Sequence, residues 1–467
     1  MTELEKRKIR KQDRFQGIEP FKRRIRVESP TPELMQEGES VTGSRLTAEW
    51  LKIKSATGSG TEPSIRLTAH LRNLLSAKHT VTMAGRTQAM HIAIRLAAEQ
   101  QYGRKTPADM TRLLAGCHVF CPDFTSIETV LPILYEGGEP VFIDALEENW
   151  CTDPEALEIA FEKYPDVRIV ITSGVYGFAG SIKEIRNICR EHNAILIEDA
   201  TESLCAHKGV GDYIVAGLTA GWNMGGGAVL LTDNDEAAGR AKRMISTSQE
   251  SSLERVSATI LPTGGNPPWR QQETIGYAYQ MPEIIAALTE ASLAHIRGYL
   301  TRKKEIYTGY LQAFDPGLIT MNEPVVGETA NYSTSAILLE SAIPFKEIRT
   351  QREYTYRSIH GTASPMEIVE ALDAFGAEAF PVYKPMHMQP LFLGCDQISL
   401  DGSILEYADK DGDREELFPR HNASKYLFEH GVCLPGSVDM TTEEQDRIIQ
   451  IVRACFNGAD MKAVKRA

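Results

Sequence analysis

The chain has 467 residues, of which 42% are hydrophobic and 24% charged, an ordinary globular composition with room for two or three domains. The formal net charge of −13 disfavours nucleic acid as the main partner, because phosphate backbones require clustered lysines and arginines. No apolar run approaches the roughly 20 residues of a membrane-spanning helix, and the N-terminus lacks the apolar core of a signal peptide. We therefore expect a cytoplasmic protein with no membrane span.

The eight cysteines are scattered along the chain. None of them forms a CxxC pair, and Cys117 and Cys121 have no matching second pair. The sequence therefore predicts reduced thiols and no metal site.

Residues 1–30 form a basic N-terminal arm that is poor in large apolar residues. One interpretation is an arm that docks on an anionic surface, and the other is a solvated tail or an arm packed on a neighbouring subunit. The second is the simpler interpretation, and the sequence leaves both open.

From about residue 64 to 245, short apolar runs alternate with stretches of helical periodicity. The expected strands are 79–83, 119–122, 140–144, 168–172 and 194–199, and the expected helices are 88–100, 127–135, 154–164 and 182–192. This alternation predicts an α/β fold, with a mostly parallel sheet covered by helices on both faces. Ligands of such sheets bind at the carboxyl ends of the strands.

A helical stretch over 283–313 is expected to link this large domain to a smaller α+β lobe. In that lobe the sequence predicts strands at 333–339 and 379–383 and helices at 344–352, 365–374, 420–430 and 441–456. The expected domains are the arm at 1–30, a large α/β domain at 31–282, the linking helix at 283–313 and a small domain at 314–467.

Several short motifs occur in an informative order. They are Pro122-Asp123-Phe124-Thr125, Gly138-Glu139-Pro140-Val141, Val175-Tyr176-Gly177, Ile197-Glu198-Asp199-Ala200, Gly276-Tyr277-Ala278-Tyr279, Lys384-Pro385-Met386-His387 and Cys433-Leu434-Pro435-Gly436-Ser437. Together they resemble the DegT/DnrJ/StrS family of pyridoxal phosphate (PLP)-dependent aminotransferases, which act on nucleotide-linked keto sugars. The likeness extends from about Ile25 to Cys455 and implies the fold-type I architecture.

The resemblance implies a cofactor site in which one residue is missing. Asp199 matches the carboxylate that holds the pyridine nitrogen of the cofactor. Glu202 lies where the family often has a glutamine or glutamate near the cofactor ring. The family's Schiff-base lysine precedes the glycine run at Gly225, but the interval 212–224 contains neither lysine nor histidine. Asn223 or Trp222 falls nearest to its place.

Two residues near this interval could supply a replacement group. His207 and Lys208 lie on a loop before Asp212, and Lys208 resembles a non-catalytic lysine of the family.

Other cofactor positions are altered as well. The family's Ser-Gly-Thr phosphate cradle is replaced by Gly85-Arg86-Thr87, and Arg86 could either bind an anion through its fork or fill the vacated site. Ser126 stands where an aromatic ring would cover the cofactor, and a carboxylate at Glu128 would repel its phosphate. Ala278 and Gln280 replace the family's asparagine and arginine.

These residues yield the site prediction. The candidate catalytic residues are Asp199, Glu202 and His207, and the candidate ligand-binding residues are Gly85, Arg86, Thr87, Ser126, Glu128, Tyr176, Asn223 and His387.

The functional prediction is a pseudoenzyme-like member that has lost Schiff-base PLP catalysis, with a refitted cleft that binds or converts a small anionic or sugar-like metabolite. Two alternatives stay open: an active PLP- or pyridoxamine phosphate-dependent transaminase or dehydratase acting on a nucleotide-linked keto sugar, and a non-catalytic subunit that partners an active paralogue. The resemblance also implies a homodimer.

Overall fold

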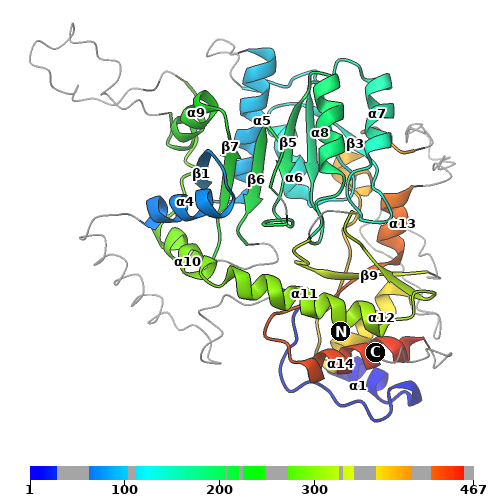
Figure 1. Cartoon of the computed structure of the whole chain (residues 1–467). Coiled ribbons are helices and arrows are strands. Elements are labelled where there is room, and N and C mark those ends of the chain that lie inside the picture. The colour runs from blue at the N-terminus through cyan, green and yellow to red at the C-terminus, as the bar shows by residue number, and fades with distance from the viewer. Residues whose placement is uncertain are drawn as a thin grey trace, which may run out of the picture.

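The computed structural model describes residues 1–28, 63–103, 111–206, 208–219, 225–248, 272, 274–325, 330–340, 364–400 and 422–456. Over these residues the chain forms a large α/β layered body and a smaller α+β lobe (Figure 1). The α/β class predicted from the sequence is confirmed.

The large body is built on an eight-stranded sheet of order β1-β7-β6-β5-β4-β2-β3-β11. Its strands are β1 (His79–Met83), β2 (His118–Pro122), β3 (Glu139–Ile143), β4 (Ile169–Ser173), β5 (Ile195–Asp199), β6 (Tyr213–Gly217), β7 (Ala228–Thr232) and β11 (Gln397–Ile398). The pairings from β6 through β11 are parallel, whereas β7 pairs antiparallel with both β6 and β1. The sheet is thus mostly parallel, as predicted.

Helices cover both faces of this sheet (Figure 1). They are α4 (Pro63–Leu74), α5 (Arg86–Tyr102), α6 (Ile127–Tyr135), α7 (Pro154–Lys163), α8 (Ile182–Glu191) and α9 (Asp235–Ile245). Because side chains alternate along a strand, Ile195 and Ile197 of β5 pack toward α5 while Leu196 packs toward α7 and α8. Burial on both faces explains why these strands are continuous apolar runs.

The predicted helix over 283–313 is two helices, α10 (Glu283–Leu293) and α11 (Ile296–Ala313). The backbone N–H of His295 bonds to the Ser292 carbonyl, so the helical hydrogen-bond pattern tightens at the junction. Neither proline nor glycine marks this point in the sequence, which is why periodicity alone predicted one helix. α10 packs on α4, and α11 continues into the small lobe.

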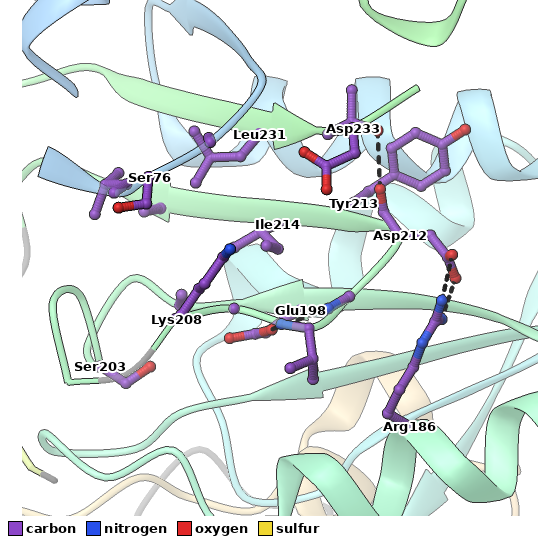
Figure 2. Close-up of a pocket in the computed structure, with 18 of the residues that line it drawn as sticks. Ser76, Arg186, Glu198, Ser203, Lys208, Asp212, Tyr213, Ile214, Leu231 and Asp233 are labelled. Atoms are coloured by element: carbon purple, nitrogen blue, oxygen red, sulfur yellow. Dashed lines mark hydrogen bonds and ion pairs between the residues drawn. The ribbon is translucent and has the colours of Figure 1, made fainter. Parts of the chain in front are cut away.

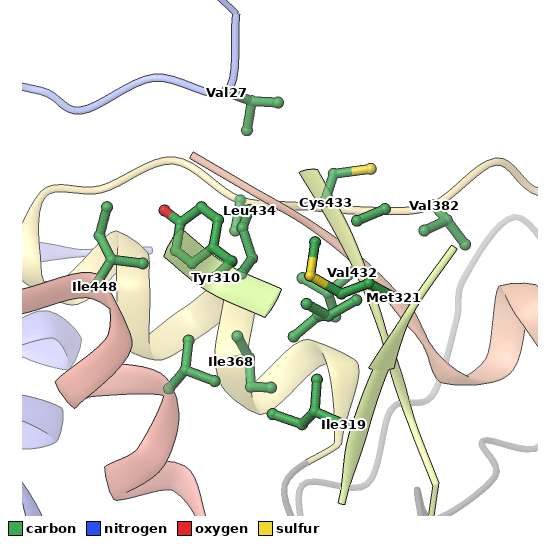
Figure 3. Close-up of a cluster of buried hydrophobic side chains, with 14 of the residues drawn as sticks. Val27, Tyr310, Ile319, Met321, Ile368, Val382, Val432, Cys433, Leu434 and Ile448 are labelled. Atoms are coloured by element: carbon green, nitrogen blue, oxygen red, sulfur yellow. The ribbon is translucent and has the colours of Figure 1, made fainter. Parts of the chain in front are cut away.

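The small lobe contains a four-stranded antiparallel sheet of order β10-β12-β9-β8. Its elements are β8 (Ile319–Met321), β9 (Ser335–Leu339), α12 (Pro365–Phe375), β10 (Phe380–Pro381), α13 (Ala423–His430), β12 (Gly431–Leu434) and α14 (Thr442–Cys455). Figure 3 shows its core, where Tyr310, Ile368, Val432 and Ile448 meet from separate elements. The predicted helix at 344–352 lies outside the described residues.

Two short 3-10 helices, η4 (Met386–Met388) and η5 (Pro390–Phe392), lead from the small sheet back to the large one. The strand β11 that follows them pairs in parallel with β3. This return connection brings residues near 383–398 against the carboxyl ends of the large sheet.

The basic N-terminal arm packs on the small lobe of its own chain. It forms α1 (Glu3–Arg10) and η1 (Asp13–Phe15), and the Phe15 ring packs against Phe375 with centroids 5.5 Å apart. Arg14 pairs with Glu367, and Arg23 pairs with Asp439 and with Glu444. The acidic surface for this arm is therefore supplied by α12 and α14, which neither sequence interpretation anticipated.

None of the helices in the described ranges is long and apolar enough to cross a membrane.

Candidate functional site

Asp199 is the centre of a buried polar cluster at the carboxyl end of β5, and its side chain has no exposed surface. Its Oδ2 accepts hydrogen bonds from Arg86 Nε at 2.9 Å, Arg86 Nη2 at 2.7 Å and the Thr129 hydroxyl at 2.8 Å. Its Oδ1 accepts from the Thr201 backbone N–H at 3.1 Å and from the Thr201 hydroxyl at 2.6 Å. Both carboxylate oxygens are therefore satisfied by the protein itself.

Arg86 reaches this carboxylate from the first position of α5, after the N-cap residue Gly85. Its Nη2 also donates to Thr129 Oγ1 at 2.7 Å, and its Nη1 donates to Ser126 Oγ at 3.2 Å. Glu128 Oε2 lies 3.6 Å from Nη1 and is half exposed, whereas the Arg86 side chain is 8% exposed. The sequence left Arg86 as either an anion-binding fork or the occupant of a vacated phosphate site; the structure places its guanidinium on the carboxylate of Asp199.

The charge state of Arg86 follows from its neighbours. Burial lowers the pKa of the guanidinium, but attraction to acidic groups, chiefly Asp199, outweighs burial and holds the pKa above its ordinary value. Arg86 is thus a fixed cation at this site.

Hydroxyl groups extend the cluster in one direction. Ser173 Oγ donates to Thr125 Oγ1 at 3.0 Å, and the hydroxyls of Thr125 and Thr129 lie 3.1 Å apart. Because the Thr129 hydroxyl donates its proton to Asp199, the Thr125 hydroxyl must donate to the Thr129 oxygen. Asp199 accepts the last of these bonds and so orients all three hydroxyls.

Glu202 forms a second buried cluster with two tyrosines. Its carboxylate accepts the Tyr176 backbone N–H at 2.7 Å and the Tyr383 hydroxyl. The two rings stack with centroids 5.1 Å apart, and the Tyr383 backbone N–H donates to the Tyr176 hydroxyl at 3.0 Å. Burial raises the pKa of Glu202 even though Tyr383 and Tyr176 donate hydrogen bonds to it.

His387 lies at a different strand end. Its Nδ1 is 2.5 Å from Asp123 Oδ2, and its backbone N–H donates to Asp123 Oδ1 at 2.9 Å. Asp123 follows β2, which lies two strands from β5 in the sheet. His387 therefore joins the η4 turn to β2, and it does so with no exposed surface.

Of the predicted site residues that the structure describes, six lie in or next to the Asp199 cluster, two form a second cluster, and His387 lies apart. The first cluster consists of Asp199, Arg86, Ser126 and Glu128. Gly85 and Thr87 flank Arg86 at the start of α5. Glu202 and Tyr176 form the second cluster, linked to the first by charge. His207 and Asn223 lie outside the described residues.

The sequence prediction missed six residues that bond within these clusters or to His387: Thr129, Thr201, Tyr383, Asp123, Thr125 and Ser173. Asp123 and Thr125 lie inside a motif that the resemblance used, Thr201 directly follows one and Tyr383 directly precedes one. The hydroxyl at Thr129, three residues after Ser126, was the available signal for a polar helix start.

A separate cavity of about 520 Å³ lies on the other face of β5 (Figure 2). Glu198 and Lys208 line it together with Ile214 and Leu231, and an Arg186–Asp212 ion pair closes one side. Glu198 and Asp199 point to opposite faces because side chains alternate along a strand. Lys208 thus lines a different space from the Arg86–Asp199 cluster.

The model of the DegT/DnrJ/EryC1/StrS aminotransferase family matches residues 51–401. The chain belongs to this family. EpsN of Bacillus subtilis (strain 168), whose name describes a pyridoxal phosphate-dependent aminotransferase, is 28% identical over 408 residues, 84% of this chain and 87% of EpsN. The spore coat polysaccharide biosynthesis protein SpsC of the same organism is 24% identical over 399 residues, 83% of this chain and 87% of SpsC.

Solved structures show the same fold. Helicobacter pylori PseC, described as an aminotransferase of pseudoaminic acid biosynthesis, superposes with a TM-score of 0.66 at 15% identity, covering 93% of this chain and 100% of PseC. The fold-type I architecture expected from the resemblance is confirmed.

Family membership raises the question of whether PLP fits these residues. A pyridine nitrogen at Asp199 needs a free carboxylate oxygen, and both oxygens already accept protein donors. The Arg86 side chain also runs from the start of α5, where a phosphate would bind, to Asp199. With Arg86 in this position the residues present do not fit PLP.

Among the described residues, no group of three or more His, Cys, Asp or Glu could hold a metal ion.

Proposed function

We propose that this member of the family binds or converts a small sugar-like metabolite in a biosynthetic pathway, without holding PLP as a lysine Schiff base. The observation that carries the proposal is the buried Arg86–Asp199 pair, with Arg86 Nη2 2.7 Å from Asp199 Oδ2. A buried carboxylate needs a positive partner, and here that partner is a side chain of the protein.

Charge favours a hydroxyl-rich ligand over an anionic one. Asp199 balances the charge of Arg86, and Glu128 adds a half-exposed carboxylate 3.6 Å from Arg86 Nη1. An anion approaching Arg86 would meet this carboxylate, whereas a sugar hydroxyl can donate to it. The exposed groups of the cluster, Ser126 and Glu128, are the proposed contacts.

The first experiment asks whether the purified chain takes PLP. The protein is incubated with excess PLP, its visible absorbance is recorded before and after an amino donor is added, and borohydride reduction is followed by intact-mass measurement. We expect no protein-bound band that responds to the donor and no covalent mass increase. A band that shifts with the donor would overturn the proposal.

A second experiment locates the ligand site. Small molecules that copurify with the native chain are identified by mass spectrometry, and their binding is compared in wild type, S126A and E128Q. We expect both variants to weaken a sugar-like ligand. Unchanged affinity in both would place the site elsewhere.

The relatives favour a second candidate function. Membership in an aminotransferase family and the 28% identity to EpsN support an active PLP- or pyridoxamine phosphate-dependent transaminase or dehydratase on a nucleotide-linked keto sugar. In that case Arg86 must leave Asp199 when the cofactor enters. The absorbance experiment separates the two, since only this candidate predicts a band.

We further propose a cytoplasmic homodimer. All eight cysteines are free thiols, which agrees with a reducing compartment. Light scattering on the purified chain should give twice the chain mass of 51.8 kDa. A monomer that gains a partner only with an active paralogue would instead support the non-catalytic subunit.

A further inference from the structure

We infer that Arg86 is a built-in occupant of the cofactor position, and that shortening this one side chain opens a site for a pyridinium phosphate such as pyridoxamine 5′-phosphate. The inference rests on the proposed function, because both require that the wild-type chain leave Asp199 to Arg86. It goes further by naming the residue that excludes the cofactor and the ligand class that its removal admits.

The guanidinium imitates the group that it replaces. It is flat and positively charged, and it presents two N–H donors to Asp199 Oδ2, at 2.9 Å from Nε and 2.7 Å from Nη2. A protonated pyridine ring is likewise flat and presents one charged N–H. The same carboxylate oxygen can accept either cation, but not both at once.

The surroundings of Arg86 are shaped for this occupant. Gly217, at the end of β6, lies beside it: an added Cβ there would be 3.4 Å from Arg86 Cβ, in ordinary van der Waals contact. The hydroxyls of Ser126 and Thr129 accept hydrogen bonds from the two terminal nitrogens of the guanidinium. Both hydroxyls belong to the start of α6, so the guanidinium is held by α6 as well as by Asp199.

The parts of the site that do not depend on Arg86 remain in place. Thr201 holds Asp199 Oδ1 through its backbone N–H and its hydroxyl, so the carboxylate stays oriented when Arg86 is shortened. α5 begins at Gly85–Arg86, runs for 17 residues and has no side-chain cap at Gly85. Backbone N–H groups at the start of a helix suit a phosphate, and Arg86 occupies the first position of this helix.

The experiment measures the binding of pyridoxamine 5′-phosphate, which needs no lysine, to wild type, R86A and R86M by titration calorimetry. Methionine extends about as far as the Nε atom of Arg86 and removes the charge together with the N–H donors, so R86M is the filled control. We expect R86A to bind with one site per chain and at least about tenfold more tightly than wild type and R86M. The R86A/D199A variant should lose that gain, and inorganic phosphate alone should not replace the ligand.

Stability provides a matched control. Arg240 is also buried and pairs with Glu99 at 3.0 Å, away from Asp199. Both R86A and R240A should melt at lower temperature than wild type, but the ligand should raise the melting temperature of R86A alone. If R86A does not fold, R86S carries the same test, because serine is as short as alanine at this position and leaves the position of the guanidinium empty.

The outcomes separate the inference from the proposed function. A folded R86A or R86S that binds the ligand no more tightly than wild type overturns the inference and leaves the proposed function standing. Equal binding by R86A and R86M shows that length does not matter and also overturns it. Tight binding by wild type contradicts both.

Discussion

Two sets of ion pairs in this chain use the same chemical groups in opposite surroundings. At the strand ends, Arg86 and Asp199 are 8% and 0% exposed. On the small lobe, Arg23 is 43% exposed and pairs with Asp439 and Glu444, which are 28% and 18% exposed. Water and salt screen the charges of the exposed pairs at Arg23. In the buried Arg86–Asp199 pair, the hydrogen bonds and the attraction between the charges must offset the free energy lost when both groups leave water.

This comparison of buried and exposed pairs shows which kind of charged pair bears on function. A surface pair such as Arg23–Asp439 can form on many folds and helps to keep the arm in place. A buried pair persists only when its hydrogen bonds are complete, and Asp199 accepts five of them from Arg86, Thr129 and Thr201. Such a complete network leaves no carboxylate oxygen for a ligand, which is why Arg86 bears on the chemistry of the site.

The largest expected effect is at the buried pair. The D199A variant leaves a buried guanidinium without its carboxylate, so we expect a loss of about 3–5 kcal/mol in the free energy of unfolding. Urea denaturation of wild type and D199A measures it. The R86M/D199A double variant should lose less than D199A, because it buries no lone charge; an additive double variant would contradict the account of the pair.

A smaller effect is expected in the Glu202 cluster. The Y383F variant keeps the ring that stacks on Tyr176 and removes the hydroxyl that donates to Glu202. The buried carboxylate then lacks one donor, so we expect a loss of about 1–3 kcal/mol by urea denaturation. Y332F is the control, since Tyr332 also packs among aromatic rings. Equal losses in the two variants would show that the Glu202 contact adds nothing.

Lys303 provides a buried cation that is bound to a carbonyl instead of a carboxylate. Its Nζ donates to the Ser333 carbonyl oxygen at 2.7 Å, and burial lowers its pKa to about 8. Between pH 8 and its ordinary value of 10.5, the folded chain releases this proton while the unfolded chain keeps it. Stability from this group therefore rises with pH over that window, by at most about 1.4 kcal/mol per pH unit.

The K303M variant tests this sign. Urea denaturation of wild type and K303M from pH 7 to 10 should show wild type gaining stability relative to the variant above pH 8, with a constant difference below it. Parallel curves across the whole range would mean that Lys303 keeps its proton in the folded chain.

The smallest effect is expected at the exposed pairs. R23A should lose only about 0.2–1 kcal/mol, and the loss should shrink in high salt. R14A is the internal comparison, because Arg14 and Glu367 are only 14% and 5% exposed. Denaturation at low and high salt measures both, and a salt-independent loss at Arg23 would place that residue in the buried class.

The sequence was sufficient for the layers of the fold because the strands are buried on both faces. The runs at Ile169–Ser173 and Ile195–Asp199 are continuous because helices cover both sides, so short apolar segments between helical stretches predicted them directly. The break at His295 was not predictable in this way, because only the tightening of a hydrogen bond marks it.

The candidate site was predictable as a set of positions but not as a set of contacts. The sequence indicated Asp199 and Arg86 as separate site residues, but with a separation of 113 positions it gave no sign that the two side chains are bonded. Tyr383 lies 181 residues from Glu202 and reaches it only through the return connection to the large sheet. The spacing of motifs along the chain indicates where strands end and helices begin. Which group a buried charge pairs with depends on tertiary packing.

A crystal structure of the wild-type chain grown with saturating PLP tests directly whether Arg86 occupies the cofactor position. We expect Arg86 to stay on Asp199, with Nε and Nη2 near 2.9 and 2.7 Å from Oδ2 and no ring between α5 and β5. A pyridine ring on Asp199 with Arg86 turned away would contradict this expectation.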